Sequence, residues 1–242
     1  MELNQAIPSS QPLEQHPLYR STGKEGRDLL AFFHVLERLK TQKRTGWVDH
    51  QVCDIRVSKH ISDHMYRMAI MAMCCSDTRL DTTKCVLLAL VHDIAEAQVG
   101  DITPRHGLSK EEKARLEEDA MHNFVHEMLH DSPAARRIMK LWKEYEARQT
   151  PEAQFVKATP RPQFDSDERI ADLDRFEMAA QAFAYEQRTG KNLQTFYNSS
   201  IPGIRHTEVR SWAAELDAER SEWRCAESTK LQHDSAQASS PS

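Results

Sequence analysis

The stretch from Leu88 to Ile102, LALVHDIAEAQVGDI, places four ionisable side chains directly after an apolar run. They are His92, Asp93, Glu96 and Asp101. Burying unpaired ionisable groups is costly, so such a cluster indicates a partner such as a metal ion. The alternative is an amphipathic helix that ends here with a polar face, because short motifs recur freely by chance.

A helix would let these side chains converge. His92 and Asp93 would lie about 100° apart around the axis, so both could reach one ion at the helix flank. Glu96 follows His92 by four positions and would lie on the same side, close to the ion without ligating it. Further candidate ligands are His64, among Met and Ala residues, and Asp174, in ADLDRFEM. A lone histidine on an apolar face is more often a core residue, so the argument depends on the whole pattern.

The elements that must position these residues are helices. Apolar residues recur with helical spacing, only seven glycines occur, and no segment shows the alternation of a strand. Asp81 is a predicted N-cap, Ser109 with Glu112 a predicted capping box, and Pro151 a predicted first helical residue. The expected helices span residues 26–42, 61–75, 82–99, 110–130, 134–148, 166–189 and 206–224, with a further one from 151. The predicted class is all-α.

Composition limits the function classes. The chain has 242 residues, 39% of them apolar and 29% charged, which is typical of a globular protein. A net charge of −5 gives no basic excess for binding a nucleic acid polymer. The sequence contains no run of 18 apolar residues, the length that would predict a membrane span. Five cysteines without a CxxC pair, and a beginning unlike a signal peptide, favour the cytoplasm, or alternatively the nucleus.

The spaced residues His64, His92-Asp93 and Asp174 resemble the H…HD…D pattern of the HD-domain metal-dependent phosphohydrolases. Longer segments are similar to the eukaryotic 5′-deoxynucleotidase branch of that family: KRTGWV, ISDHMYRMAIMA, LALVHDIAEAQVGDITP, SKEEK, TPEAQFVK, DLDRFEM and LQTFYNS. The resemblance implies an HD-domain helical bundle over residues 24–222, and the Pro-, Ser- and Gln-rich composition of the two ends predicts disordered tails at 1–23 and 223–242. It also implies a homodimer that removes phosphate from deoxyribonucleoside 5′-monophosphates with a divalent cation.

The resemblance assigns roles residue by residue. His64, His92, Asp93 and Asp174 match the metal ligands, a mixture that suits Mn²⁺, Co²⁺, Mg²⁺, Fe²⁺ or Zn²⁺. Glu96 and Asp101 match catalytic acidic positions. On spacing alone, Asp101 could equally be a cap or turn residue after Gly100.

Two residues of KRTGWV match the family's substrate-binding positions. Arg44 can hold a phosphate bidentately, and the indole of Trp47 can pack on the nucleoside. The alternative is a helix-terminal arginine beside a half-buried tryptophan.

Two departures from the family concern the site. Residues 158–171 form an insert before Asp172 in which Pro160 and Pro162 must break a helix. Asp165 or Ser166 can cap a new helix, so Asp174 can still face inward. The loop before His64 also differs and contains His60, to which the sequence assigns no role.

Three alternatives differ in function class. The insert could have cost the chain its catalysis, leaving an HD-fold scaffold or regulatory protein. The substrate could be another nucleotide, cyclic or oligophosphate. HEMLH, residues 126–130, also matches the H-E-x-x-H signature of zinc metalloproteases, with Glu127 as base, although a chance match is ordinary.

Overall fold

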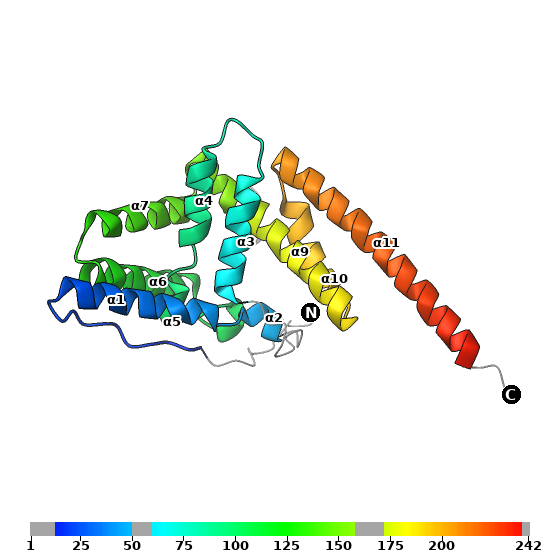
Figure 1. The fold of residues 1–242 in the computed structure, drawn as a ribbon, viewed down its shortest axis with the longest axis horizontal. Helices are drawn as coiled ribbons and strands as arrows, with labels where there is room; N and C mark the ends of the chain where they lie inside the picture. Colours follow the sequence, from blue (N-terminus) through cyan, green and yellow to red (C-terminus); the bar gives the residue numbers. More distant parts are fainter. Residues whose placement is uncertain (1–12, 50–59, 158–171, 239–242) are drawn as a thin grey trace, which may run out of the picture. The chain divides into compact units, whose positions relative to one another are not determined.

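The computed structural model describes residues 13–49, 60–157 and 172–238 (Figure 1). Within these ranges every regular element is helical, apart from one isolated antiparallel bridge between Lys43 and His60. The all-α class predicted from the sequence is confirmed. None of the helices in these ranges has an apolar stretch that could span a lipid bilayer.

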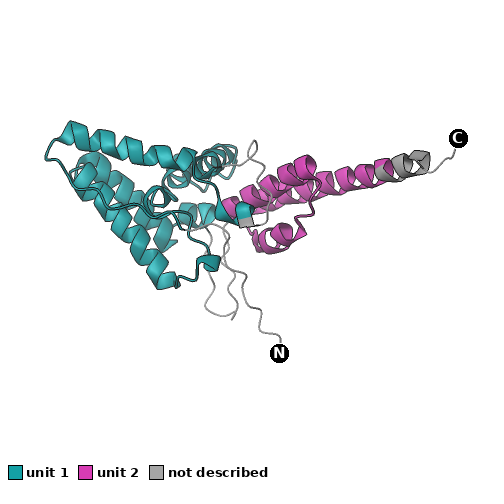
Figure 2. Cartoon of the chain, turned by 90° about the horizontal axis from the view of Figure 1, so that it is seen from below, with its two compact units in different colours: residues 1–159 teal, residues 160–242 magenta. Residues whose placement is uncertain are grey.

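The chain divides into two compact units, residues 1–159 and residues 160–242, drawn in teal and magenta in Figure 2. The single domain expected over 24–222 therefore extends across both units. The elements of the first unit are α1 (Glu25–Leu36), η1 (Glu37–Lys40), α2 (Thr45–Asp49), α3 (Ile61–Met73), α4 (Thr82–Val91), α5 (Glu96–Val99), η2 (Pro104–His106), α6 (Lys110–Asn123), η3 (Phe124–Met128), α7 (Pro133–Ala147) and α8 (Pro151–Val156). Those of the second are α9 (Asp172–Thr189), α10 (Gln194–Ser200), η4 (Ile201–Gly203) and α11 (Thr207–Ala238).

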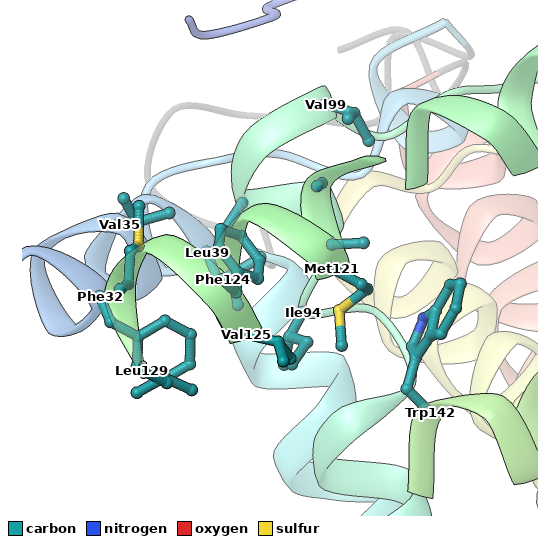
Figure 3. Packing of buried hydrophobic residues seen from close by; sticks show 14 of the residues in the cluster. Phe32, Val35, Leu39, Ile94, Val99, Met121, Phe124, Val125, Leu129 and Trp142 are labelled. Carbon is teal, nitrogen blue, oxygen red and sulfur yellow. The ribbon is translucent and has the colours of Figure 1, made fainter. Parts of the chain in front are cut away.

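The core of the first unit lies between α1, α5, α6, η3 and α7 (Figure 3). The rings of Phe32 and Phe124 meet edge to face, with centroids 5.5 Å apart. Trp142 closes the core from α7, and Met121 lies at its centre with no exposed surface. Helix α4 packs against α3, α7 and α8. The end of α4 is thereby held beside α3, where the candidate ligands meet.

The predicted helix starts in the first unit are confirmed. Asp81 accepts a hydrogen bond from the Lys84 amide and caps α4. Ser109 and Glu112 form the capping box of α6. His60, which had no assigned role, is the N-cap residue of α3, and its amide donates to the Asp63 carboxylate at 3.1 Å.

The predicted continuous helix over 82–99 is wrong. Helix α4 ends at Val91, and α5 begins only at Glu96. In an α-helix the Ala89 carbonyl would accept a hydrogen bond from the Asp93 amide. Here it accepts one from the ring nitrogen Nδ1 of His92, at 2.8 Å. The amides of residues 94 and 96 then bond to carbonyls three residues back, which tightens the chain into a turn.

The tail predicted over residues 1–23 is wrong for residues 13–23, and residues 1–12 lie outside the described part of the chain. The His16 amide donates to the Gln98 carbonyl at 3.0 Å, and Asn123 exchanges two hydrogen bonds with the Tyr19 backbone. The carboxylate of Asp28, which is 0% exposed, accepts hydrogen bonds from the side chains of residues 19, 21 and 22. Composition alone cannot show these partners, because they lie far along the chain.

The tail predicted over 223–242 is wrong for residues 223–238, which continue α11. This stretch contains neither glycine nor proline, so nothing in it forces the helix to end. Arg224 also donates to Glu186 of α9 at 3.0 Å. The same carboxylate accepts two hydrogen bonds from Arg220 and one from the Leu193 amide, so α11 is anchored within the second unit.

Candidate metal centre

Three predicted ligands converge in the first unit. His64 comes from the buried face of α3, His92 from the end of α4, and Asp93 from the turn that follows. Their ligand atoms all lie within 4.8 Å of one another. Oδ2 of Asp93 is 2.8 Å from Nε2 of His92 and 4.0 Å from Nε2 of His64. The three side chains therefore offer two imidazole nitrogens and one carboxylate oxygen around a single point.

One ring nitrogen of His92 is occupied by its backbone partner. A carbonyl oxygen accepts only, so Nδ1 must carry the proton that it donates to Ala89, which leaves Nε2 as the nitrogen that can bind a metal ion. Nε2 is buried and makes no hydrogen bond among the described residues, although the Asp93 carboxylate lies beside it. A ring N–H donated to a carbonyl is typical of metal-ligating histidines. This residue set therefore fits a divalent metal ion.

Asp93 is suited to ligation in its charged form. Burial raises the pKa of its carboxyl, but His92, His64 and Arg44 outweigh burial and hold that pKa well below its usual range. Its side chain keeps 24% of its surface exposed. A carboxylate that is ionised and reachable from solvent can bind both a cation and an incoming ligand.

Glu96 has the opposite electrostatic setting. Its side chain is buried, with 7% exposed, at the first turn of α5. Burial, together with the negative charges of Asp93 and Asp101, raises its pKa well above the usual value. Two carboxyls three residues apart thus differ in proton affinity, as acid–base chemistry requires.

Asp101 anchors the neighbouring loop. Its Oδ2 accepts the Thr45 amide at 2.6 Å, and its backbone carbonyl accepts the Thr45 hydroxyl at 3.0 Å. Thr45 is the first residue of α2, and the first amides of a helix have no partner within the helix. The Asp101 carboxylate therefore accepts a hydrogen bond from one of these amides. This contact supports the structural alternative for Asp101, and its catalytic role stays a prediction.

The two predicted substrate-binding residues differ in their surroundings. Arg44 is partly exposed, and its charge lowers the pKa of Asp93, which places it within electrostatic reach of the centre. Trp47 is only 2% exposed, so it is a core residue and is more deeply buried than the half-buried alternative described. A nucleoside would meet at most a small part of its indole.

Asp174 lies in the second unit, in the first turn of α9. It follows the predicted insert at 158–171, which lies outside the described residues together with the caps expected at Asp165 and Ser166. Its role as the fourth ligand stays a prediction.

Two lysines lie near the centre that the sequence did not identify as candidate site residues. Lys113 donates to the Ile102 carbonyl at 2.9 Å. Burial lowers its pKa, but the surrounding acidic side chains, Glu117 foremost, outweigh burial and keep it above the usual range. Both lysines fall in segments that carry the family resemblance, SKEEK and TPEAQFVK, but nothing in their spacing distinguishes them from surface lysines.

The second lysine, Lys157, contacts an aromatic ring that packs against a residue of the centre. Its ammonium lies 4.2 Å above the ring of Tyr145, and that ring packs against His92 with centroids 5.1 Å apart. Only the folded chain brings these residues together.

The HEMLH signature does not form a site. Residues 124–128 adopt a π-helical turn, and His130 has a left-handed backbone with φ of 49°. His126 pairs with Asp131 at 2.7 Å, whereas His130 binds the buried Asp28 at 2.9 Å. The two histidines thus have separate partners, which argues against the metalloprotease alternative.

Comparison with known proteins assigns the family. The pattern of the HD domain matches residues 36–216. The chain is 42% identical over 202 residues to human 5′-deoxynucleotidase HDDC2, covering 83% of this chain and 90% of the relative. It is 39% identical to 5′-deoxynucleotidase hdd1 of Schizosaccharomyces pombe, covering 84% and 96%. The protein belongs to the HD domain family.

Solved structures agree with this assignment. HD domain-containing protein YGK1 superimposes with a TM-score of 0.57 at 30% identity, over 83% of this chain and 89% of that one. A predicted metal-dependent phosphohydrolase from Magnetospirillum magnetotacticum has a TM-score of 0.56 at 22% identity, over 82% and 93%, and it supports the fold alone. Both matches extend over more of the chain than either compact unit contains.

Proposed function

We propose that this protein is a metal-dependent 5′-deoxynucleotidase, a phosphoric monoester hydrolase that converts deoxyribonucleoside 5′-monophosphates to deoxyribonucleosides and phosphate. The observation that carries the proposal is the convergence of His64, His92 and Asp93 within 4.8 Å. The names of relatives at about 40% identity support the same activity.

A divalent cation would be held by His64, His92 and Asp93, with Asp174 proposed as the fourth protein ligand. When bound, it would neutralise phosphate charge and make a nearby water more acidic. Imidazole with carboxylate suits Mn²⁺, Co²⁺, Fe²⁺, Zn²⁺ or Mg²⁺, and the donor set does not choose among them.

The chain's own groups supply proton transfer and binding. Burial raises the pKa of Glu96, which favours its protonated form and suits it to give a proton to the departing sugar oxygen. Asp101 is proposed as a second acidic group near the sugar, although its contact with Thr45 already gives it a structural role. Arg44 is proposed to bind the phosphate and Trp47 to line the nucleoside site.

The test is phosphate release from dAMP, dGMP, dCMP and dTMP with Mn²⁺ or Co²⁺, repeated with EDTA. Asp93→Asn removes one ligand charge at constant shape and should abolish both release and metal retention. Asp119→Asn is the matched control, because Asp119 is an exposed carboxylate paired with Arg115 on α6. Equal activity of Asp93→Asn and Asp119→Asn would contradict the proposal.

The same assay separates the alternatives. Release only from cyclic or oligophosphate nucleotides would indicate another phosphohydrolase of this family. Folded, metal-loaded protein without activity on any nucleotide would indicate the scaffold or regulatory protein.

We propose that residues 24–222 act as one HD domain and that the insert at 158–171 permits a complete site. Asp174→Asn then lowers the amount of bound metal per chain, measured by elemental analysis after dialysis. Asp217→Asn, a change in α11 of the same unit, serves as its control. Unchanged metal content in Asp174→Asn would remove that residue from the ligand set.

Two further properties are proposed for this chain. The resemblance favours a homodimer, which light scattering on the eluting protein would establish or refute. The cytoplasm is the proposed location, and no disulfide joins the four cysteines of the described residues; imaging of the tagged chain would test that location.

A further inference from the structure

Two exposed histidines stack at the end of α6, outside the centre described above. His122 lies in the last turn of α6 and His126 in the π-helical turn η3. Nδ1 of His122 is 3.3 Å from Nε2 of His126, and the ring centroids are 5.4 Å apart. Their side chains are 45% and 51% exposed, so solvent reaches both rings.

The separation of these nitrogens matches a chelating pair. Zinc binds imidazole nitrogen at about 2.0–2.1 Å, so two such nitrogens at a tetrahedral angle lie about 3.3–3.4 Å apart. Because the rings are exposed, their planes, now 26° apart, can turn so that both lone pairs meet at one point.

Each imidazole also has a carboxylate behind it. Nδ1 of His126 is 2.7 Å from Oδ1 of Asp131, so that nitrogen carries a proton and Nε2 keeps its lone pair. Nε2 of His122 faces Oε1 of Glu118 at 3.7 Å. A carboxylate at hydrogen-bond distance, as Asp131 is to His126, orients a metal-ligating histidine, whereas Glu118 adds a negative charge near the ring of His122.

The backbone holds Asp131 in this place. His130 and Asp131 both have left-handed conformations, with φ of 49° and 51°, which are uncommon for residues other than glycine. The ring of His130 is fixed by Asp28, which has no exposed surface, so the turn that presents Asp131 is anchored in the core. The carboxylate that orients His126 is therefore preorganised.

We propose that His122 and His126 form a surface site for an imidazole-preferring divalent transition metal ion of the Zn²⁺, Cu²⁺ and Ni²⁺ class. Asp131 orients the ring of His126, Glu118 lies near the ring of His122, and water completes the coordination. On binding, the hydrogen bond between the rings is replaced by two bonds to the metal. The proton of His122 moves from Nδ1 to Nε2, beside Glu118. The site joins the last turn of α6 to the π-helical turn, and it shares no residue with the HD-domain centre.

The test is calorimetric titration of the untagged full-length chain with Zn²⁺. His122→Gln and His126→Gln should each bind one Zn²⁺ fewer per chain than the unmodified protein. His34→Gln is the matched control, because His34 is an exposed histidine on α1, and it should bind the same amount as the unmodified protein. Asp131→Asn should keep the stoichiometry and weaken the affinity of this site about tenfold to a hundredfold.

The result is distinguishable from that of the HD-domain centre. His122→Gln should release phosphate from deoxynucleotides as the unmodified chain does, and Cu²⁺ at the surface site should show coupling to two nitrogens by electron paramagnetic resonance. Equal Zn²⁺ stoichiometry in His122→Gln and His34→Gln would overturn the proposal. Binding that requires millimolar Zn²⁺ would also overturn it.

Discussion

Substituting Glu96 with glutamine tests the acid–base assignment most directly. The change keeps the size of the side chain and removes its proton donor. Glu96 is buried, and burial with the charges of Asp93 and Asp101 raises its pKa well above the usual value. It is therefore the carboxyl near the centre best suited to hold a proton at neutral pH.

The expected loss in kcat is about 10²–10⁴-fold, the usual contribution of a positioned acid or base. This corresponds to about 3–5 kcal/mol of transition-state stabilisation. The KM for dAMP should change little, because the proton is transferred only in the transition state. Metal content should also be unchanged, because Glu96 is not among the proposed ligands.

The free energy of unfolding should increase in Glu96→Gln, whereas its kcat decreases. A carboxyl whose pKa is raised by folding stabilises the folded state below its unfolded pKa of about 4.3, and this contribution is lost as pH rises through the folded pKa. Every tenfold rise in its proton affinity on folding represents about 1.4 kcal/mol. Glu96→Gln has no charge to bury, so its stability relative to the unmodified chain should increase from about pH 4 upward. This comparison uses the metal-free chain, because a bound cation would lower the same pKa.

The assays are steady-state phosphate release and urea unfolding across pH. Glu117→Gln is the control, since Glu117 is a half-buried carboxyl with a raised pKa that no motif assigns to catalysis. A kcat for Glu96→Gln within tenfold of the unmodified value would refute the assignment of Glu96 as the acid. A loss of stability at neutral pH would refute the inference from its burial.

Three further substitutions test how the fold is held. Arg220→Met should lower the free energy of unfolding by about 1.5–3 kcal/mol in urea titration, because it removes the bidentate partner of the buried Glu186 carboxylate and leaves only Arg224 and the Leu193 amide. Asp28→Asn should speed proteolytic cleavage within residues 13–23. Since hydrogen bonds hold the pKa of Asp28 below its usual range despite burial, the unmodified chain should lose that protection as pH falls below about 4. Gly100→Ala should cost about 1–2 kcal/mol in the same urea assay, because φ is 81° and the added Cβ would lie 3.2 Å from a Leu13 methyl group.

The sequence predicts the helices of this protein well because their signals are local. Asp81, Ser109 and Pro151 each mark a helix start that the structure confirms. Apolar spacing also identified the buried face of α3 that carries His64. These signals depend on residues within one or two turns, and tertiary contacts reinforced them.

Predictions failed where a distant or side-chain contact overrides local preference. The break between α4 and α5 depends on the His92 ring bonding to a backbone carbonyl, which no periodicity reveals. Residues 13–23 lack a helical or strand pattern, and their order comes from partners such as Asn123, about a hundred positions away. Composition distinguishes segments that cannot form a core from those that can, but it does not detect hydrogen bonds made by an extended segment.

The two histidine motifs show why spacing alone does not define a metal site. H-E-x-x-H at 126–130 requires one regular helix, and a π-helical turn with two left-handed residues removes that geometry. His92 and Asp93 still form a candidate metal site although α4 ends beside them. The reason is that α3 supplies His64, from 28 positions upstream, within reach of Asp93. The second motif is thus completed by helix packing rather than by periodicity. A histidine motif should therefore be judged by which other element can deliver the next ligand.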